Sequence, residues 1–123
     1  MPADRPLAVF CALCGALAVV LGAFAAHGAG PQVKTLLTTG AHYQMVHALL
    51  GLVCAFWAAR SRLAVIAGWL AGVGGLIFGL ALSSIGLVGL KAMGAVAPVG
   101  GVLMIAGWLV AGFAVFRSQS VNA

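Results

Sequence analysis

The sequence is almost devoid of acidic residues. Only one of its 123 residues is Asp or Glu, and that residue is Asp4, close to the N-terminus. Catalysis by paired carboxylates, carboxylate-bound Mg²⁺ or Ca²⁺, and acidic proton relays through a membrane are therefore excluded. A Ser-His-Asp triad is excluded on the same ground, unless another subunit supplies the acid. We therefore expect a protein that is not an enzyme.

Charge of either sign is scarce. Charged residues make up 6% of the chain and hydrophobic residues 64%. In a typical soluble domain, about 25% of the residues are charged and roughly 45–50% are hydrophobic. A soluble chain with so few charges could not cover its core, so the composition predicts a membrane protein with a single domain, residues 1–123. The net charge of +5 does not indicate nucleic-acid binding, because the cations are scattered between apolar stretches.

Four apolar stretches are long enough to cross a bilayer, which needs about 20 helical residues. They are residues 7–26, 41–59, 63–84 and 95–116. The third is placed to end at Ser84, because serine and glycine interrupt the apolar run there. The first resembles a signal peptide, but its apolar run exceeds the usual length of roughly 7–15 residues, so a retained helix is predicted. The fold class is thus an all-α bundle of four transmembrane helices.

The positions of Lys and Arg predict the orientation of these spans. One side of a four-span topology carries Arg5, Arg60, Arg62 and Arg117, and the other carries Lys34 and Lys91. Because cytoplasmic loops carry the excess of cations, both termini are expected in the cytoplasm.

The first outer loop, residues 27–40, predicts a helix of its own. Gly30-Pro31 is a typical helix start, and apolar residues then recur at helical spacing, at Val33, Leu36 and Leu37. This pattern predicts a short amphipathic helix at the outer membrane interface. The helix either runs on into the second span or bends at Gly40.

Glycine is abundant, with 18 residues. Lipid tails are as apolar as Leu, so helices associate in a bilayer through small residues that let their backbones approach. The glycines predicted to pack helices are Gly68, Gly72, Gly75 and Gly79 in the third span, and Gly15 and Gly22 in the first. The fourth span carries small residues on two faces, which leaves a homo-oligomer open.

His47 and Gln44 share the small-residue face of the second span and so should point into the bundle. An ionisable residue inside a membrane is a functional candidate by default. The alternative is that a neutral His and a Gln hydrogen-bond between helices and only hold them together. Since no carboxylate is available to pair with His47, the second interpretation is favoured.

His27 and His42 should lie at similar depth near the outer surface. Two His without Cys or carboxylate partners make a poor zinc site, so no metal and no cofactor are predicted. Cys11 and Cys14 form a C-x-x-C pair, but inside an apolar helix they are expected to behave as small hydrophobic residues. The candidate functional polar cluster therefore comprises His27, His42, Tyr43, Gln44 and His47.

Three motifs carry a resemblance to a known family. They are Gly22-Ala23-Phe24-Ala25-Ala26-His27-Gly28, Tyr43-Gln44-Met45-Val46-His47-Ala48-Leu49, and Pro98-Val99-Gly100-Gly101 with Gly107-Trp108. The chain resembles, over nearly its whole length, the small bacterial inner-membrane proteins called domain of unknown function 423, whose eukaryotic relatives are called transmembrane protein 256. It departs from them at Phe78-Gly79-Leu80-Ala81-Leu82-Ser83, where the family is serine-rich. The resemblance implies a multi-pass inner-membrane protein with no established activity.

Three functions remain open from the sequence. The first is a non-enzymatic packing or accessory module in the lipid bilayer that associates with itself or with a larger membrane complex. The second is a small transporter or channel subunit whose polar path is lined by His47, Gln44 and Tyr43. The third and least favoured is a redox subunit that binds a cofactor through His27 and His42.

Overall fold

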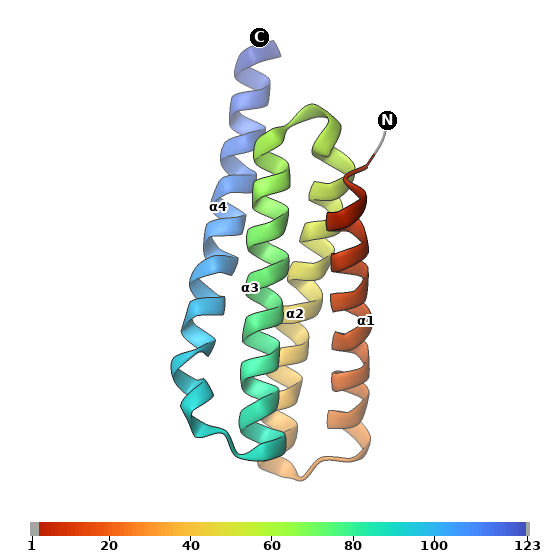
Figure 1. Cartoon of the computed structure of the whole chain (residues 1–123), viewed down its shortest axis with the longest axis vertical. Helices are drawn as coiled ribbons and strands as arrows, with labels where there is room; N and C mark the ends of the chain where they lie inside the picture. The colour runs from red at the N-terminus through yellow and green to blue at the C-terminus, as the bar shows by residue number, and fades with distance from the viewer. Residues whose placement is uncertain (1–2, 123) are drawn as a thin grey trace.

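The computed structural model describes residues 3–122, and the side chains of residues 3–117. Its four long helices run up and down in alternation, so the first and last described residues lie at the same end (Figure 1). These helices are α1 (Arg5–His27), α2 (Pro31–Trp57), α3 (Arg62–Val88) and α4 (Ala97–Asn122), with the short 3-10 helices η1 (Ala58–Arg60) and η2 (Lys91–Ala95). Four helices are long and apolar enough to span a membrane. The prediction of an all-α protein with four such helices is confirmed.

Local capping determines where the helices begin and end. The Asp4 side chain accepts a hydrogen bond from the backbone N–H of Leu7 (3.0 Å) at the start of α1. The Ser61 hydroxyl accepts one from the backbone N–H of Ala64 (3.2 Å) at the start of α3. α3 ends at Val88 because Gly89 adopts the left-handed conformation with φ of 70°. The sequence-based end at Ser84 was thus too early, since Ser and Gly here continue the helix.

The expected amphipathic helix is the N-terminal part of α2. Residues 31–40 are continuous with the rest of that helix. Their apolar side chains, Val33, Leu36 and Leu37, surround Gly86 of α3, and Leu37 is fully buried. The apolar face of this segment therefore packs on α3 instead of lying on the bilayer surface. Of the two expected continuations, α2 adopts the straight one.

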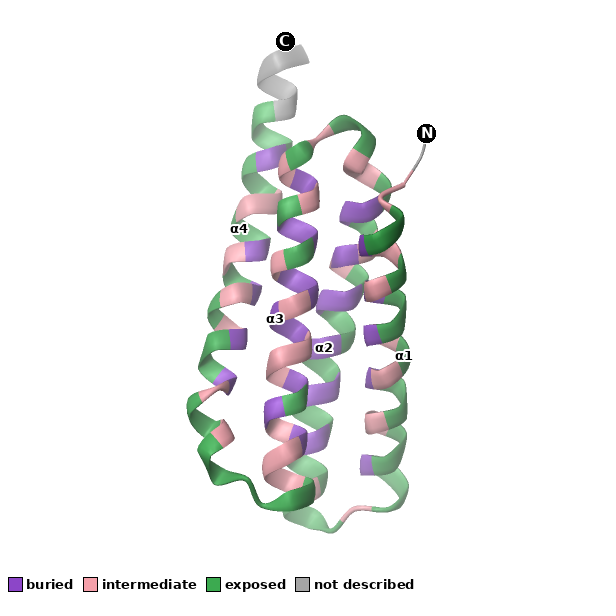
Figure 2. Cartoon of the chain, viewed as in Figure 1, coloured by how far each residue is buried: buried purple, intermediate pink, exposed green. Residues whose placement is uncertain are grey.

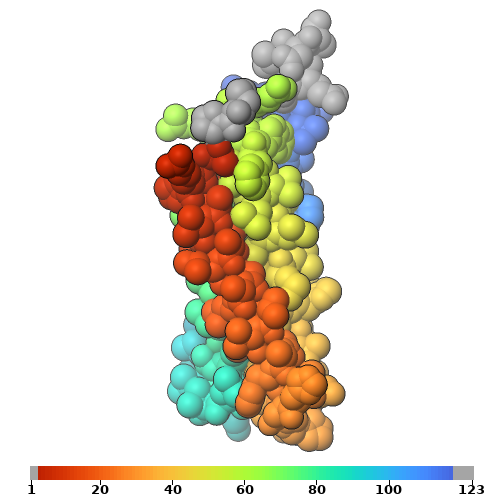
Figure 3. Space-filling view, turned by 90° about the vertical axis from the view of Figure 1, so that its right-hand side faces the viewer, coloured from red at the N-terminus to blue at the C-terminus, as the bar shows by residue number. Residues whose placement is uncertain are grey.

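Over residues 3–122, the four helices do not form a closed ring, because α1 and α4 make no extensive contact with each other. α3 lies between α2 and α4 and contacts both extensively, whereas α1 packs on α2 and less on α3. α1 runs obliquely across the molecule with α2 beside it (Figure 3). Buried residues concentrate on the facing sides of α2 and α3, and the outward sides of α1 and α4 are exposed (Figure 2). α4 thus rests mainly on one neighbour, so a large part of its surface is not covered by this chain.

Small residues dominate the interior. One core cluster lies near the start of α1 and consists of Leu7, Cys11, Cys54, Ala55, Ala64 and Ala67. Large apolar side chains such as Leu13, Phe56 and Leu109 are instead exposed by two-thirds or more. This inverted distribution is what a bilayer requires, since large apolar side chains face lipid and small residues bring the helices together.

Candidate functional site

The glycines of α3 leave space in the core that side chains of the neighbouring helices occupy. A Cβ at Gly75 would lie 3.0 Å from the Cβ of His47 on α2. A Cβ at Gly79 would meet Oε1 of Gln44, which also lies on α2. The predicted packing glycines of α3 therefore have two roles. Gly68 and Gly72 allow close contact with side chains of α1 and α2, namely Leu7, Phe10, Cys11 and Cys54. Gly75 and Gly79 instead leave space for the two buried polar side chains.

A second glycine face on α3 was missed from the sequence. A Cβ at Gly74 would come within 2.8 Å of the Gly100 carbonyl oxygen of α4, and one at Gly100 within 2.7 Å of the Gly74 oxygen. A Cβ at Gly107 of α4 would lie 2.9 Å from the backbone nitrogen of Ala71 on α3. The α3–α4 contact is therefore backbone against backbone, as in small-residue packing of transmembrane helices.

The two packing glycines predicted on α1 face α2, but less tightly than the glycines of α3 and α4 face each other. A Cβ at Gly15 would lie 3.8 Å from the Cβ of Ala48, and one at Gly22 would lie 3.8 Å from the Cβ of Ala41. These are ordinary van der Waals distances. The α1–α2 contact thus uses small residues without requiring glycine at these positions.

Gln44 is fully buried and ties α2 to α1. Its side-chain Nε2 donates a hydrogen bond to the backbone carbonyl of Cys14 (2.8 Å). Its Oε1 points toward Gly79 of α3 and has no hydrogen-bond partner among the described residues. The same holds, within that part of the chain, for the Ser83 hydroxyl one turn further along α3. Among the described residues, a buried amide oxygen and a buried hydroxyl group therefore lack a hydrogen-bond partner.

His47 ties α2 to α4. Its Nδ1 lies 2.7 Å from the backbone carbonyl of Tyr43, and its Nε2 lies 2.9 Å from the indole Nε1 of Trp108. The side chain is 5% exposed. The two ring nitrogens therefore face partners of opposite kinds, a hydrogen-bond acceptor at Nδ1 and a hydrogen-bond donor at Nε2.

The two partners of His47 indicate which of its ring nitrogens carries the proton. A carbonyl oxygen only accepts, so Nδ1 must carry a proton, and an indole N–H only donates, so Nε2 must carry a lone pair. The arrangement fits the neutral imidazole with its proton on Nδ1. An imidazolium would turn an N–H toward the Trp108 N–H and lose that bond.

Aromatic rings surround this bond where α2, α3 and α4 meet. The Tyr43 ring centroid lies 6.3 Å from that of His47 and 5.3 Å from that of Phe78 on α3. The Trp108 ring stands edge-on to His47, with centroids 6.0 Å apart. Tyr43 and Trp108 are about half exposed, at 45% and 50%. The bond thus lies just beneath the surface, between two rings that reach outward.

The structure does not gather all five predicted residues into one site. Tyr43, Gln44 and His47 lie together on α2, with His42 exposed beside Tyr43 at a ring distance of 5.7 Å. His27 is exposed at the end of α1. In the described part of the chain, no three His, Cys, Asp or Glu side chains are placed to hold a metal ion together. What this arrangement can do chemically is hydrogen-bond between helices.

Trp108 is the residue that sequence reasoning missed. A signal for it existed, since Trp108 stands in one of the three motifs that carry the family resemblance. The motif alone does not reveal which residue Trp108 contacts, because that depends on the position of α3 between α2 and α4.

Comparison with known proteins identifies the family. A family model described as protein of unknown function, DUF423, matches residues 21–101. A UPF0382 membrane protein of Haemophilus influenzae is 35% identical over 118 residues, covering 89% of this chain and 93% of its own length. A UPF0382 membrane protein of Bacillus subtilis is 37% identical over 100 residues, covering 76% and 81%. No solved structure matches. The chain is therefore a membrane protein that belongs to the DUF423 family.

Proposed function

We propose that this chain is a non-catalytic membrane module that acts by associating with other transmembrane helices, either of a second copy or of a larger membrane complex. The observation that carries the proposal is the commitment of the Gln44 amide nitrogen and of both His47 ring nitrogens. Gln44 donates to the Cys14 carbonyl, and both ring nitrogens of His47 are bonded within the bundle. Side chains engaged in this way hold helices together and are not free to bind a substrate.

The open packing of α4 supports the same proposal. α4 rests mainly on α3, and its other sides expose large apolar residues including Val102, Ile105 and Leu109. Gly101 and Gly112 also lie on α4 with no atom within 4 Å of an added Cβ. A helix of another protein can approach closely at such positions.

Co-purification at native expression level tests this proposal. The full chain, cross-linked in the membrane and extracted in mild detergent, should recover a defined partner or a second copy. Gly112→Leu should reduce that recovery, because its side chain obstructs the exposed face of α4. Leu13→Phe adds bulk on the exposed side of α1, outside the proposed face, and serves as the control. Recovery of a monomer alone would contradict the proposal.

We also propose an inner-membrane location with both termini in the cytoplasm. The support is the charge asymmetry, because Arg5, Arg60, Arg62 and Arg117 lie at one end of the bundle, with the two lysines at the other. Reporter fusions after Arg60 and after the C-terminus should read cytoplasmic, and a fusion at Lys34 should read periplasmic. A periplasmic C-terminus would refute this orientation.

Transport is the second candidate, and one observation favours it. Gln44 Oε1 and Ser83 Oγ are buried, and within the described chain neither has a hydrogen-bond partner. Such atoms are commonly satisfied by water, so they would mark a hydrated path. If one exists, Ser83→Cys should react with a water-soluble maleimide, and Ala81→Cys, equally buried at 2% exposure, should not. Equal protection of both variants would remove this candidate.

A further inference from the structure

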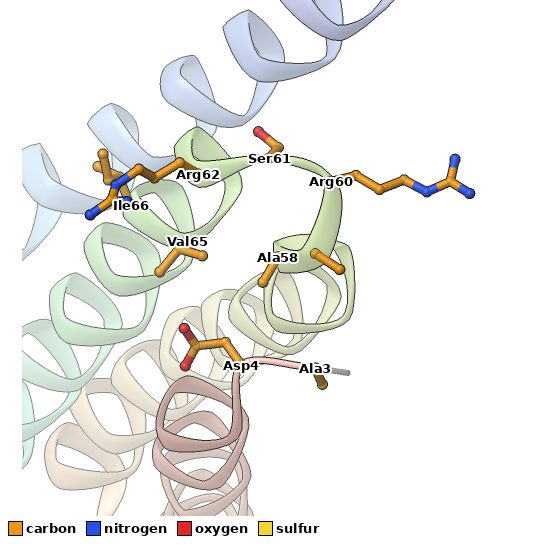
Figure 4. Close-up of a pocket in the computed structure, with 9 residues that line it drawn as sticks. Ala3, Asp4, Ala58, Arg60, Ser61, Arg62, Val65 and Ile66 are labelled. Atoms are coloured by element: carbon orange, nitrogen blue, oxygen red, sulfur yellow. The ribbon is translucent and has the colours of Figure 1, made fainter. Parts of the chain in front are cut away.

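A hollow lies at the end of the bundle where the chain begins. It is lined by Asp4 before α1, by residues of η1 and by the first turns of α3, and its volume is about 780 Å³ (Figure 4). A backbone hydrogen bond from Asp4 N to the Ala55 carbonyl (2.9 Å) holds the chain start against α2 here. The hollow is therefore formed by three segments that the fold brings together.

Charges of both signs line this hollow. Arg60 and Arg62 flank Ser61 in the α2–α3 loop, with the Arg60 side chain extending outward and Arg62 lying alongside Ile66 (Figure 4). The Asp4 carboxylate points toward α3 from the opposite wall (Figure 4). Its Oδ1 accepts the Leu7 N–H, and that bond leaves Oδ2 uninvolved. The single carboxylate of the chain thus shares a hollow with two of its six cations.

The rest of the lining is apolar and sits at a defined depth. Val65, Ile66, Ala58 and Ala59 complete the wall. The hollow lies where the apolar spans of α2 and α3 end and their loop begins, which is the level of lipid headgroups. Arginine side chains at such positions extend toward phosphate while their stems stay on apolar surface.

From these observations, we propose that the hollow binds the headgroup of a phospholipid that carries a phosphate and a primary amine, as in phosphatidylethanolamine. The Arg60 and Arg62 guanidinium groups point to opposite sides of the hollow (Figure 4). They rotate inward on their flexible stems to contact the phosphate, which arginine binds through charge-assisted hydrogen bonds. The ammonium group donates to Asp4 Oδ2. The glycerol end of the lipid rests on Val65 and Ile66.

The carboxylate decides between lipid classes. An anionic headgroup without an amine, such as phosphatidylglycerol, would find the arginines but would also face Asp4. A choline headgroup carries the same charges as ethanolamine, but its quaternary nitrogen has no N–H to donate. Asp4 therefore selects for a primary amine, while Arg60 and Arg62 select for phosphate.

Lipid retention tests this inference. The full chain is reconstituted in vesicles of equimolar phosphatidylethanolamine, phosphatidylglycerol and phosphatidylcholine, extracted, and analysed by native mass spectrometry for the lipids that remain bound. We expect phosphatidylethanolamine to be enriched over the other two. Arg60→Gln with Arg62→Gln should lower its retention by about three- to tenfold, the scale of losing exposed ionic contacts. Arg117→Gln removes an exposed cation outside the hollow and should leave retention unchanged.

Asp4→Asn tests the amine contact without disrupting the helix start. Asn caps a helix as well as Asp does, so the Leu7 N–H keeps its acceptor. This variant should lose the preference for ethanolamine over choline and should retain more phosphatidylglycerol. Three results would overturn the inference: unchanged retention in the double arginine variant, an equal loss in Arg117→Gln, or a wild-type preference for phosphatidylglycerol. Displacement of the lipid by equimolar soluble phosphoethanolamine would instead show a site for a free phosphate ester and would refute the lipid.

Discussion

α3 makes two extensive contacts, and they differ in what stands opposite its glycines. Toward α2, Gly75 and Gly79 face the side chains of His47 and Gln44. Toward α4, Gly74 faces the backbone of Gly100 at a distance that leaves no room for a Cβ. The end of the Gln44 side chain can rotate away from a methyl group added at Gly79, but a Cβ or a backbone atom can yield only if the helices separate. The α3–α4 contact should therefore tolerate substitution least.

The largest effect is expected at Gly100. Gly100→Ala should destabilise the bundle by about 1–3 kcal/mol, the usual cost of overpacking a tight core, because its Cβ would lie 2.7 Å from Phe78 N. Gly101→Ala is the matched control, since no atom lies within 4 Å of its added Cβ. Thermal unfolding in detergent, followed by circular dichroism, measures both. Equal midpoints would show that α4 does not pack backbone against backbone.

The next effect concerns the bond that joins α2 to α4. His47→Leu and Trp108→Phe should each cost about 1 kcal/mol, the scale of an interhelical hydrogen bond in a membrane. Because both remove the same bond, the double variant should cost clearly less than the sum of the two. His47→Gln should be nearly silent, since its amide oxygen can still accept from Trp108. Strict additivity in this cycle would mean that the two side chains do not interact.

A smaller effect distinguishes two substitutions at Gly79. Gly79→Ala pushes against Gln44 Oε1 and offers it nothing, whereas Gly79→Ser brings a hydroxyl that can donate to that oxygen. Ser should therefore be more stable than Ala, by about 0.5–1.5 kcal/mol, the net contribution of one hydrogen bond. Unfolding midpoints of the two variants in the same detergent give the difference. If Ala is the more stable, Gln44 Oε1 already has a partner such as water.

The smallest effect is expected on α1. Gly15→Ala should be neutral or stabilising by up to about 1 kcal/mol, because Ala is the better helix former and its Cβ would meet Ala48 at 3.8 Å. Gly51→Ala, on the facing helix, should instead be destabilising, since its Cβ would overlap Cys11 Sγ. The same unfolding assay compares them. A large loss at Gly15 would show that α1 packs more tightly than this structure has it.

Much of this fold follows from the sequence, because span length and small-residue spacing are local properties. The four helices and the direction of Gln44 and His47 could be predicted in that way. The end of α3 could not be predicted, because Gly86 looks like a helix breaker until side chains of α2, including Leu37, are present to cover it. Similarly, the N-terminal part of α2 is amphipathic in sequence, and nothing local shows whether its apolar face meets lipid or α3.

The candidate site was only half predictable for a related reason. A small-residue stripe shows that a face is packed but not which helix packs there, so Gly74 was overlooked while its neighbour Gly75 was found. The contact between His47 and Trp108 depends on α3 separating α2 and α4 by a suitable distance. That spacing is a property of the whole bundle and leaves no pattern in either helix alone.

The central claim is that His47 is a neutral hydrogen-bonded link between α2 and α4, and its tautomer tests this most directly. Nitrogen NMR of the full chain in nanodiscs, with ¹⁵N-labelled histidine, distinguishes the two ring nitrogens. The structure predicts a protonated Nδ1 and an unprotonated Nε2, with slow solvent exchange, and loss of the Nε2 hydrogen-bond shift in Trp108→Phe. A His47 ring that changes charge near neutral pH and exchanges rapidly with water would contradict the claim and favour a hydrated path.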